Sequence, residues 1–210
     1  MKTKSLHLIV GLLLLGCTSN HDSGKTKLMV GIVVDQMRQD YLYRFQSHFG
    51  EYGFKRFYNE GFVAKNHHFD YQQTKTGPGH ASIATGTPPA INGIIGNDWF
   101  DKQSGKHRYC VDDHNFLSLG TAKTKGKAPT ALLVSTFADE NRLATQMNGK
   151  AVSVSLKDRS AILSIGHTAN GAYWFSGGDE GNFISSTFYM DALPAWVADF
   201  NASRKIDEYL

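Results

Sequence analysis

The chain is organised around one stretch, Thr74-Lys75-Thr76-Gly77-Pro78-Gly79-His80-Ala81-Ser82. Thr76 stands where a helix N-cap belongs, and Pro78 falls in the first turn, where its missing N–H group costs nothing. The N-terminus of a helix directs unpaired N–H groups and partial positive charge at whatever Thr76 touches. Such a site can hold a phosphate or favour an alkoxide, although the stretch taken alone is more simply a capped surface helix.

An apolar run precedes this stretch and ends at Asp35: Leu28-Met29-Val30-Gly31-Ile32-Val33-Val34. A continuous apolar run is typical of a strand buried on both faces of a parallel sheet. Asp35 then lies at the carboxyl end of that strand, where open α/β sheets place their ligands. An aspartate that caps the next helix is the alternative. We also predict helices within residues 38–49 and 51–60, and a strand over residues 62–69 that leads to Thr76.

The second half of the chain repeats the pattern of a strand followed by charged residues. Ser135 or Thr136 is expected to cap a helix that runs to about residue 147, and residues 151–156 alternate as a strand. Lys157-Asp158-Arg159 follows at the carboxyl end of this strand, where a solvated charged turn is the alternative. Residues 101–127 are a polar excursion whose lysines are most simply a solvated surface.

The alternation of strands and helices predicts an α/β sandwich, with a mainly parallel central sheet flanked by helices. Asp35, Thr76 and the pair Lys157/Arg159 fall at or just beyond the carboxyl ends of strands, so we expect them to converge on one edge of the sheet. A carboxylate, a hydroxyl and two cations suit metal-assisted phosphoryl transfer through a covalent intermediate.

The N-terminus has the layout of an export signal. Residues 1–17 combine two lysines with a short apolar run, and Leu14-Leu15-Gly16-Cys17 resembles a bacterial lipobox, in which the cysteine carries lipid. An ordinary signal peptide that happens to contain a cysteine is the alternative. Residues 18–27 are polar and predict a flexible tether, and residues 28–210 are left for the catalytic domain. We therefore expect an exported bacterial lipoprotein, anchored to a membrane by lipid at Cys17 and facing the periplasm or the cell exterior.

The composition and the net charge argue against nucleic-acid binding. The chain has 210 residues, 41% of them apolar, and a formal charge of +3. Lys2 and Lys4 belong to the signal, so the mature charge is 3 − 2 = +1, and no nucleic-acid binding is expected. Cys110 is the only other cysteine; it is either buried and structural, which we favour, or paired outside this chain.

Four motifs in order resemble the alkaline phosphatase superfamily, and in particular its PafA-type phosphate monoesterases with a threonine nucleophile. The motifs are Val33-Val34-Asp35-Gln36-Met37-Arg38, Thr76-Gly77-Pro78-Gly79-His80-Ala81-Ser82, Gly93-Ile94-Ile95-Gly96-Asn97-Asp98-Trp99 and Ser155-Leu156-Lys157-Asp158-Arg159. The resemblance implies that Thr76 is the nucleophile and also a zinc ligand, and that Asp35 binds the same zinc. It further implies that Asn97, Lys157 and Arg159 contact the phosphoryl group of small phosphorylated metabolites.

The resemblance also implies two zinc ions, most of whose aspartate and histidine ligands come from a later part of the family's chain. Only Asp35 and Thr76 match metal positions here, and His107, His114 and His167 match none. We therefore expect the chain to be the N-terminal portion of a larger enzyme and to be inactive alone.

Three alternatives remain. A phosphodiesterase or nucleotide pyrophosphatase of the same superfamily uses the same threonine and zinc, but Lys157 and Arg159 favour the monoesterase. A sulfatase is disfavoured because that branch uses a modified cysteine or serine where Thr76 stands. From a different class comes an inactive truncated lipoprotein that merely binds anions.

Overall fold

The computed structural model describes residues 26–121, 125–176 and 180–209, and the chain divides into two units, residues 1–34 and 35–210. The predicted signal peptide (residues 1–17) with Cys17, and all but two residues of the predicted tether (residues 18–27), lie outside the described residues. In the part of the chain that is described, no helix is long and apolar enough to cross a membrane.

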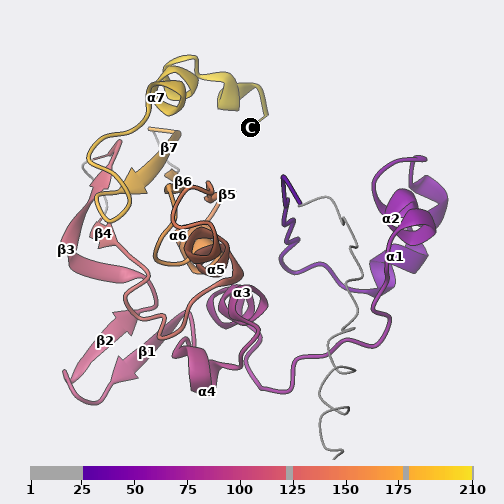
Figure 1. Cartoon of the computed structure of the whole chain (residues 1–210), viewed down its shortest axis with the longest axis horizontal. Helices are drawn as coiled ribbons and strands as arrows, with labels where there is room; N and C mark the ends of the chain where they lie inside the picture. Colours follow the sequence, from indigo (N-terminus) through magenta and orange to yellow (C-terminus); the bar gives the residue numbers. More distant parts are fainter. Residues whose placement is uncertain (1–25, 122–124, 177–179, 210) are drawn as a thin grey trace, which may run out of the picture. The chain divides into compact units, whose positions relative to one another are not determined.

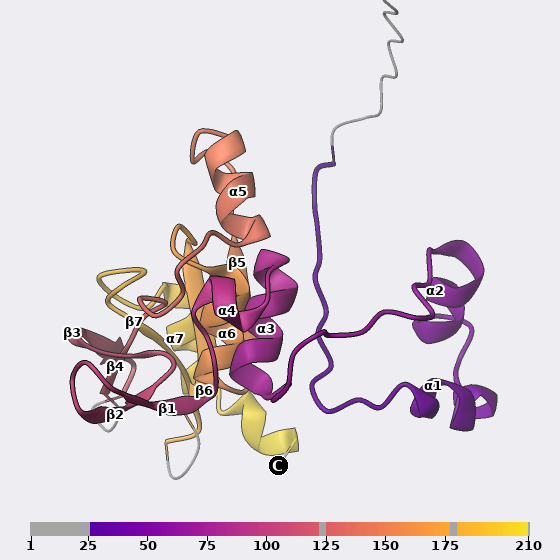
Figure 2. The same ribbon diagram turned by 90° about the horizontal axis from the view of Figure 1, so that it is seen from below.

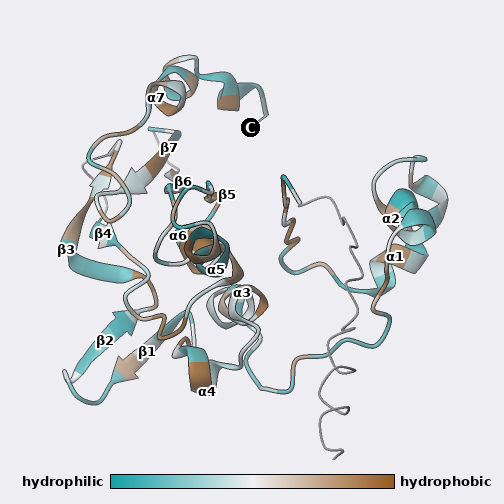
Figure 3. Cartoon of the chain, in the orientation of Figure 1, coloured by the Kyte–Doolittle hydropathy of each residue, from teal (hydrophilic) through white to brown (hydrophobic). Residues whose placement is uncertain are grey.

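The described part of the first unit is an extended segment rather than a strand. Residues 26–34 have no regular secondary structure, and Figure 3 colours much of this segment as hydrophobic. Leu28 and Ile32 are 78% and 73% exposed. The prediction of a buried strand over residues 28–34 is therefore wrong for this structure. A strand needs a neighbouring strand for its backbone hydrogen bonds, and an apolar sequence alone does not supply one.

Among the described residues, the regular elements all lie in the second unit (Figure 1). Its helices are α1 (Asp40–Arg44), η1 (Gln46–His48), α2 (Phe54–Glu60), α3 (Thr76–Thr85), α4 (Pro89–Asn92), α5 (Phe137–Ala144), α6 (Asp158–Ile165), α7 (Ala195–Ala202) and η2 (Lys205–Tyr209). Its strands are β1 (Asp98–Asp101), β2 (Lys106–Tyr109), β3 (Asp112–Leu119), β4 (Lys125–Lys127), β5 (Val152–Ser155), β6 (Gly171–Ser176) and β7 (Asn182–Ser186). The strand predicted over residues 62–69 is irregular chain, because no neighbour pairs with it among the described residues.

The strands form a two-stranded hairpin, β1–β2, and a five-stranded sheet in the order β4-β3-β7-β6-β5. The large sheet of this chain is mixed and not mainly parallel as predicted. β5 and β6 are parallel and are connected through α6, whereas β6–β7, β7–β3 and β3–β4 are antiparallel. A helical crossover is what a parallel pair requires, and a short connection such as that between β6 and β7 requires an antiparallel pair.

The helices of the core are arranged in layers. α6 packs against β5 and β6, and α3 and α5 pack against α6 (Figures 1 and 2). Ile162 and Leu163 of α6 are fully buried with Ala81 of α3. Burying a side chain of the size of leucine stabilises a fold by about 1.5–3 kcal/mol, so α6 anchors both α3 and the parallel strands.

A buried aspartate ties α5 to the loop that follows α6. Thr136 and Asp139 form a capping box at the start of α5, which confirms Thr136 as the cap. Asp139 is 2% exposed and also accepts hydrogen bonds from the backbone N–H groups of His167 and Thr168 at 2.8 and 2.7 Å. Burial opposes its charge, but the hydrogen bonds from His167, Thr136 and Thr168 outweigh burial and hold the pKa of Asp139 well below its ordinary range.

Candidate active site

Thr76 is the first residue of α3 and not its N-cap, which corrects the prediction. Lys75 occupies the cap position without a side-chain hydrogen bond. The Thr76 hydroxyl is therefore not used to cap the helix. It donates instead to Asp35 Oδ2 at 3.0 Å, and Asp35 is exposed. We call Asp35 and Thr76 the nucleophile pair, after the role that the sequence analysis predicts for Thr76. The structure thus brings together two of the residues that the sequence singled out, 41 positions apart in the chain.

The backbone bends unusually beside both members of the nucleophile pair. Gln36 and Gln73 adopt the left-handed region with φ of 59° and 60°, although neither is glycine. Such conformations are uncommon outside glycine, asparagine and aspartate, and they concentrate at functional sites. They set the directions in which the chain leaves Asp35 and approaches Thr76.

Asn97 lies against the first turn of α3. The Gly77 N–H group, which has no partner inside the helix, donates to Asn97 Oδ1 at 2.7 Å. A Cβ atom at position 77 would lie 3.2 Å from that same oxygen, so this close approach favours glycine. Because Oδ1 accepts from Gly77, the Nδ2 amide of Asn97 is left as a donor for a ligand.

The β1–β2 hairpin contacts both α3 and α6 through the residues at its two ends. Asn97 directly precedes β1, and its carbonyl accepts from the N–H of Cys110, which directly follows β2. Cys110 is free and buried, as predicted, and burial raises the pKa of its thiol to about 12, so it stays a neutral packing group. Its neighbour Tyr109 contacts the first turn of α6. The hairpin thus places Asn97 and Tyr109 beside the two helix N-termini.

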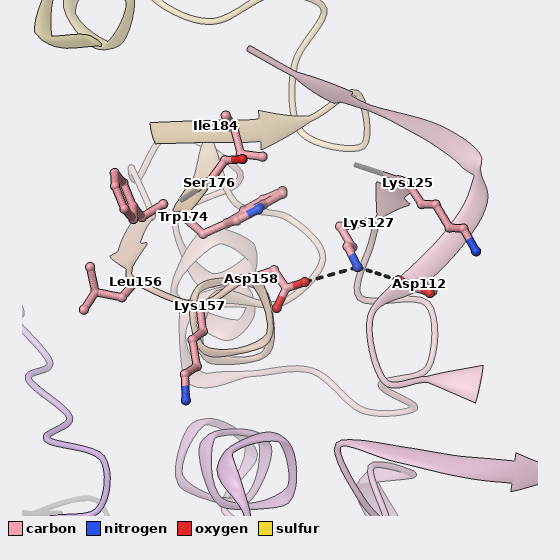
Figure 4. A pocket seen from close by; sticks show the side chains of 10 residues that line it. Asp112, Lys125, Lys127, Leu156, Lys157, Asp158, Trp174, Ser176 and Ile184 are labelled. Carbon is pink, nitrogen blue, oxygen red and sulfur yellow. Dashed lines mark hydrogen bonds and ion pairs between the residues drawn. The ribbon is translucent and has the colours of Figure 1, made fainter. Parts of the chain in front are cut away.

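Lys157 and Arg159 follow β5, as predicted, and they lie at the start of α6, a helix that the sequence analysis did not predict. Lys157 is the exposed N-cap residue, and its side chain extends away from Asp158 and Lys127 (Figure 4). Arg159 Nη1 donates to the Tyr109 hydroxyl at 2.7 Å, and that hydroxyl donates to Asp158 Oδ1 at 2.6 Å. Burial, and then the hydrogen bond to Asp158, raise the pKa of Tyr109 well above its ordinary value, so the hydroxyl keeps its proton.

Lys127 completes this arrangement, which corrects its interpretation as a solvated surface lysine. Its ammonium lies 2.5 Å from Asp112 Oδ1 and 3.2 Å from Asp158 Oδ2 (Figure 4), and 4.5 Å from the centre of the Tyr109 ring. Burial opposes its charge, but the hydrogen bond to Asp112 and the charge of Asp158 raise the pKa of Lys127. We call Asp112, Lys127, Asp158, Tyr109 and Arg159 the tyrosine network.

Sequence reasoning missed that Tyr109, Asp112 and Lys127 join the residues at the start of α6. Tyr109 contacts residues 49 and 50 positions away, a distance that follows from the path of the hairpin and not from any spacing in the sequence. The single local signal is that Tyr109 is an aromatic residue at the end of a polar strand.

Asp35 and Thr76 can contribute two oxygen ligands to a shared metal ion, since their oxygens already lie 3.0 Å apart. A zinc site ordinarily takes three or four protein ligands. Among the described residues, no group of three or more histidine, cysteine, aspartate or glutamate side chains is arranged to hold a metal. Asp35 and Thr76 can therefore supply two ligands of such a site and not a complete set.

Comparison with known proteins places the chain in a family of phosphoryl-transfer enzymes. The chain belongs to the type I phosphodiesterase / nucleotide pyrophosphatase family, whose model matches residues 29–209. It is 55% identical over 186 residues to the alkaline phosphatase PhoV of Synechococcus elongatus, across 88% of this chain and 34% of that protein. It is 48% identical over 190 residues to the alkaline phosphatase PafA of Elizabethkingia meningoseptica, across 90% of this chain and 35% of that protein.

The crystal structure of wild-type PafA superposes on the chain with a TM-score of 0.79 and 49% identity, over 81% of this chain and 33% of that one. The predicted superfamily and its α/β fold are therefore confirmed. The chain spans about a third of the length of these relatives.

Proposed function

We propose that residues 28–210 form the N-terminal portion of the catalytic domain of a zinc-dependent phosphate monoester hydrolase, an alkaline phosphatase that acts through a phosphothreonine at Thr76. The observation that carries the proposal is the hydrogen bond from Thr76 Oγ1 to Asp35 Oδ2 at the N-terminus of α3. Relatives that are named alkaline phosphatases support it. Activity then belongs to an enzyme of the relatives' full length, and residues 1–210 alone are inactive.

In this proposal Thr76 Oγ1 attacks the phosphorus atom of a small phosphorylated metabolite, and the ester bond to the leaving oxygen breaks. Zinc, when bound by Asp35 and Thr76 together with further ligands, supplies Lewis-acid stabilisation of the charge on the threonine oxygen. Before the attack the Thr76 hydroxyl keeps its proton and donates it in a hydrogen bond to Asp35 Oδ2. When Oγ1 attacks, this proton passes to the leaving oxygen, which departs as an alcohol. Water then cleaves the new Oγ1–phosphorus bond and restores the threonine.

Asn97, Lys157 and Arg159 bind the phosphoryl group. Asn97 Nδ2 donates to a non-bridging oxygen, and the two cations offset the charge on the equatorial oxygens. Positioning and electrostatic stabilisation supply most of the catalysis of phosphoryl transfer.

The direct test is to trap the intermediate in the full-length enzyme. Acid quenching during turnover of an aryl phosphate, followed by peptide mass spectrometry, should place one phosphate on Thr76. Thr85, a part-buried threonine in the same helix, is the internal control and should stay unmodified. Phosphate on any residue other than Thr76 would overturn the assignment.

The description of the matching family supports a second candidate, a phosphodiesterase or nucleotide pyrophosphatase. The same nucleophile pair serves both reactions. We favour the monoesterase because a diester carries an extra ester group where Lys157 and Arg159 would sit, and the discriminating experiment is given in the Discussion.

We propose further that the protein is an exported bacterial lipoprotein, tethered to a membrane through lipid on Cys17 and working in the periplasm or at the cell surface. Mass spectrometry of the protein from its host should find diacylglycerol on Cys17, and an unmodified Cys17 would contradict this. The remaining alternative is an inactive truncated lipoprotein. Reading the coding sequence after codon 210 separates the two, because a continuing frame with aspartate and histidine ligands supports the enzyme.

A further inference from the structure

The guanidinium of Arg159 makes a single hydrogen bond in the described part of the chain. A guanidinium has five N–H donors, and Arg159 uses one of them, on Nη1, to bond the Tyr109 hydroxyl. Its Nε is buried and has no hydrogen-bond partner there. A buried N–H group without a partner is costly, unless a ligand completes it. The remaining donors therefore suit an oxyanion such as the phosphoryl group.

Tyr109 stands between Arg159 and the carboxylate that would otherwise attract it. The hydroxyl accepts from Arg159 and donates to Asp158, and no ion pair joins Arg159 to Asp158 among the described residues. A direct pair with a carboxylate would be bidentate in its preferred form and would use two guanidinium donors. The Tyr109 hydroxyl uses one donor of the Arg159 guanidinium instead of two and leaves the other donors available to a ligand.

The other members of the tyrosine network hold Asp158 in place. Asp158 Oδ2 contacts Lys127 at 3.2 Å, and Lys127 contacts Asp112 at 2.5 Å. Asp158 Oδ1 also accepts from the backbone N–H of Arg159 at 2.7 Å. Lys127 thus contacts both carboxylates, and Asp158 also accepts hydrogen bonds from Tyr109 and from the Arg159 backbone, so both of its oxygens have partners without a direct contact from the Arg159 guanidinium.

We infer that Tyr109 is a positioning residue: it orients Arg159 toward the phosphoryl group and separates the guanidinium from Asp158. The inference rests on the proposed function, in which Arg159 binds the phosphoryl group. Tyr109 itself touches no reacting atom. Its role is to keep an essential cation from being captured by the neighbouring carboxylate.

The orientation of Arg159 is tested without any turnover. In residues 1–210 labelled with nitrogen-15, the Nε–Hε resonance of Arg159 should be distinct, and it should shift or broaden in Tyr109→Phe. This variant keeps the ring over Lys127 and removes only the hydroxyl. The matched control is Tyr189→Phe, which removes another hydroxyl with one hydrogen bond, to the Gly166 carbonyl at 2.9 Å, and should leave Arg159 unchanged. An unchanged Arg159 resonance in Tyr109→Phe overturns the inference.

The consequence for specificity is tested in the full-length enzyme. Tyr109→Phe should lower kcat/KM for an aryl monoester about tenfold, and for a matched diester less than about threefold, because one charged hydrogen bond is lost. Adding Asp158→Asn to Tyr109→Phe should restore part of the monoester activity, since the competing charge is gone. Equal losses on both substrates, or losses no larger than those of Tyr189→Phe, overturn the inference. If Arg159→Ala itself leaves monoester turnover intact, the proposed function fails, while the resonance of Arg159 still reports on Tyr109.

Discussion

The candidate site has two halves, the nucleophile pair and the tyrosine network, and they differ in burial and in how many contacts hold them together. The nucleophile pair rests on one hydrogen bond between an exposed aspartate and the first residue of α3. The tyrosine network is partly buried and joins five side chains through hydrogen bonds and ion pairs. A metal site at the nucleophile pair needs further ligands, and no group of them is found among the described residues. Arg159, by contrast, is already held by Tyr109. Under the proposed function, this contrast means that the phosphoryl-binding half is preformed in this part of the chain and that the nucleophile half is completed by metal.

The largest effect should come from the nucleophile. In the full-length enzyme, Thr76→Ala should lower turnover of both monoesters and diesters by roughly 10⁴-fold or more, because it removes the attacking oxygen. Thr85→Ala, a threonine of the same helix, should change neither by more than about threefold. Steady-state kcat/KM for an aryl monoester and a matched diester provides the measurement. Retention of substantial turnover in Thr76→Ala would place the nucleophile elsewhere.

Removing Lys157 or Arg159 should slow hydrolysis of a monoester more than hydrolysis of a diester. Lys157→Ala or Arg159→Ala should cost about 2–4 kcal/mol in the transition state by removing charge-assisted hydrogen bonds. Monoester kcat/KM should therefore fall by about two to three orders of magnitude, and diester kcat/KM much less. Equal losses on both substrates would defeat the monoesterase assignment and favour the diesterase.

Much of this arrangement follows from local sequence. Gly-Pro-Gly after Thr76 predicts the helix start, and Lys157 and Arg159 follow β5, at the carboxyl end of a strand as predicted. Thr136 and Asp139 have the spacing of a capping box, and Thr136 is the cap. These features depend on residues a few positions apart, where backbone geometry leaves few choices.

The remainder depends on contacts between distant residues. Lys127 looks like any surface lysine until β3 and β4 bring it to Asp112, and until α6 brings it to Asp158. Residues 28–34 have the composition of a buried strand, but composition does not specify a neighbour to pair with. Long-range pairing therefore limits what the sequence predicts, for the site as for the fold.

A smaller effect on the fold itself should follow from changing Asp139. Asp139→Asn should lower the free energy of unfolding by about 2–4 kcal/mol, because an amide cannot accept from all of the surrounding donors. Urea denaturation of residues 1–210 measures this, with the exposed Asp191→Asn as the control. Because the pKa of Asp139 is lowered, its contribution is present above the unfolded-state pKa of about 3.9 and is lost as pH falls toward the folded-state value. A wild-type protein no more acid-sensitive than Asp139→Asn would contradict this account.

The contrast between the two halves is tested most directly by hydrogen exchange in the full-length enzyme, stripped of zinc with a chelator and then reloaded. Amide exchange followed by mass spectrometry reports local opening of each segment. On reloading, exchange should slow in peptides that contain Asp35 and Thr76, and should stay the same in peptides that contain Tyr109 and Arg159. If the Tyr109 and Arg159 peptides slow as much as those of the nucleophile pair, the phosphoryl-binding half is not preformed, and the account is contradicted.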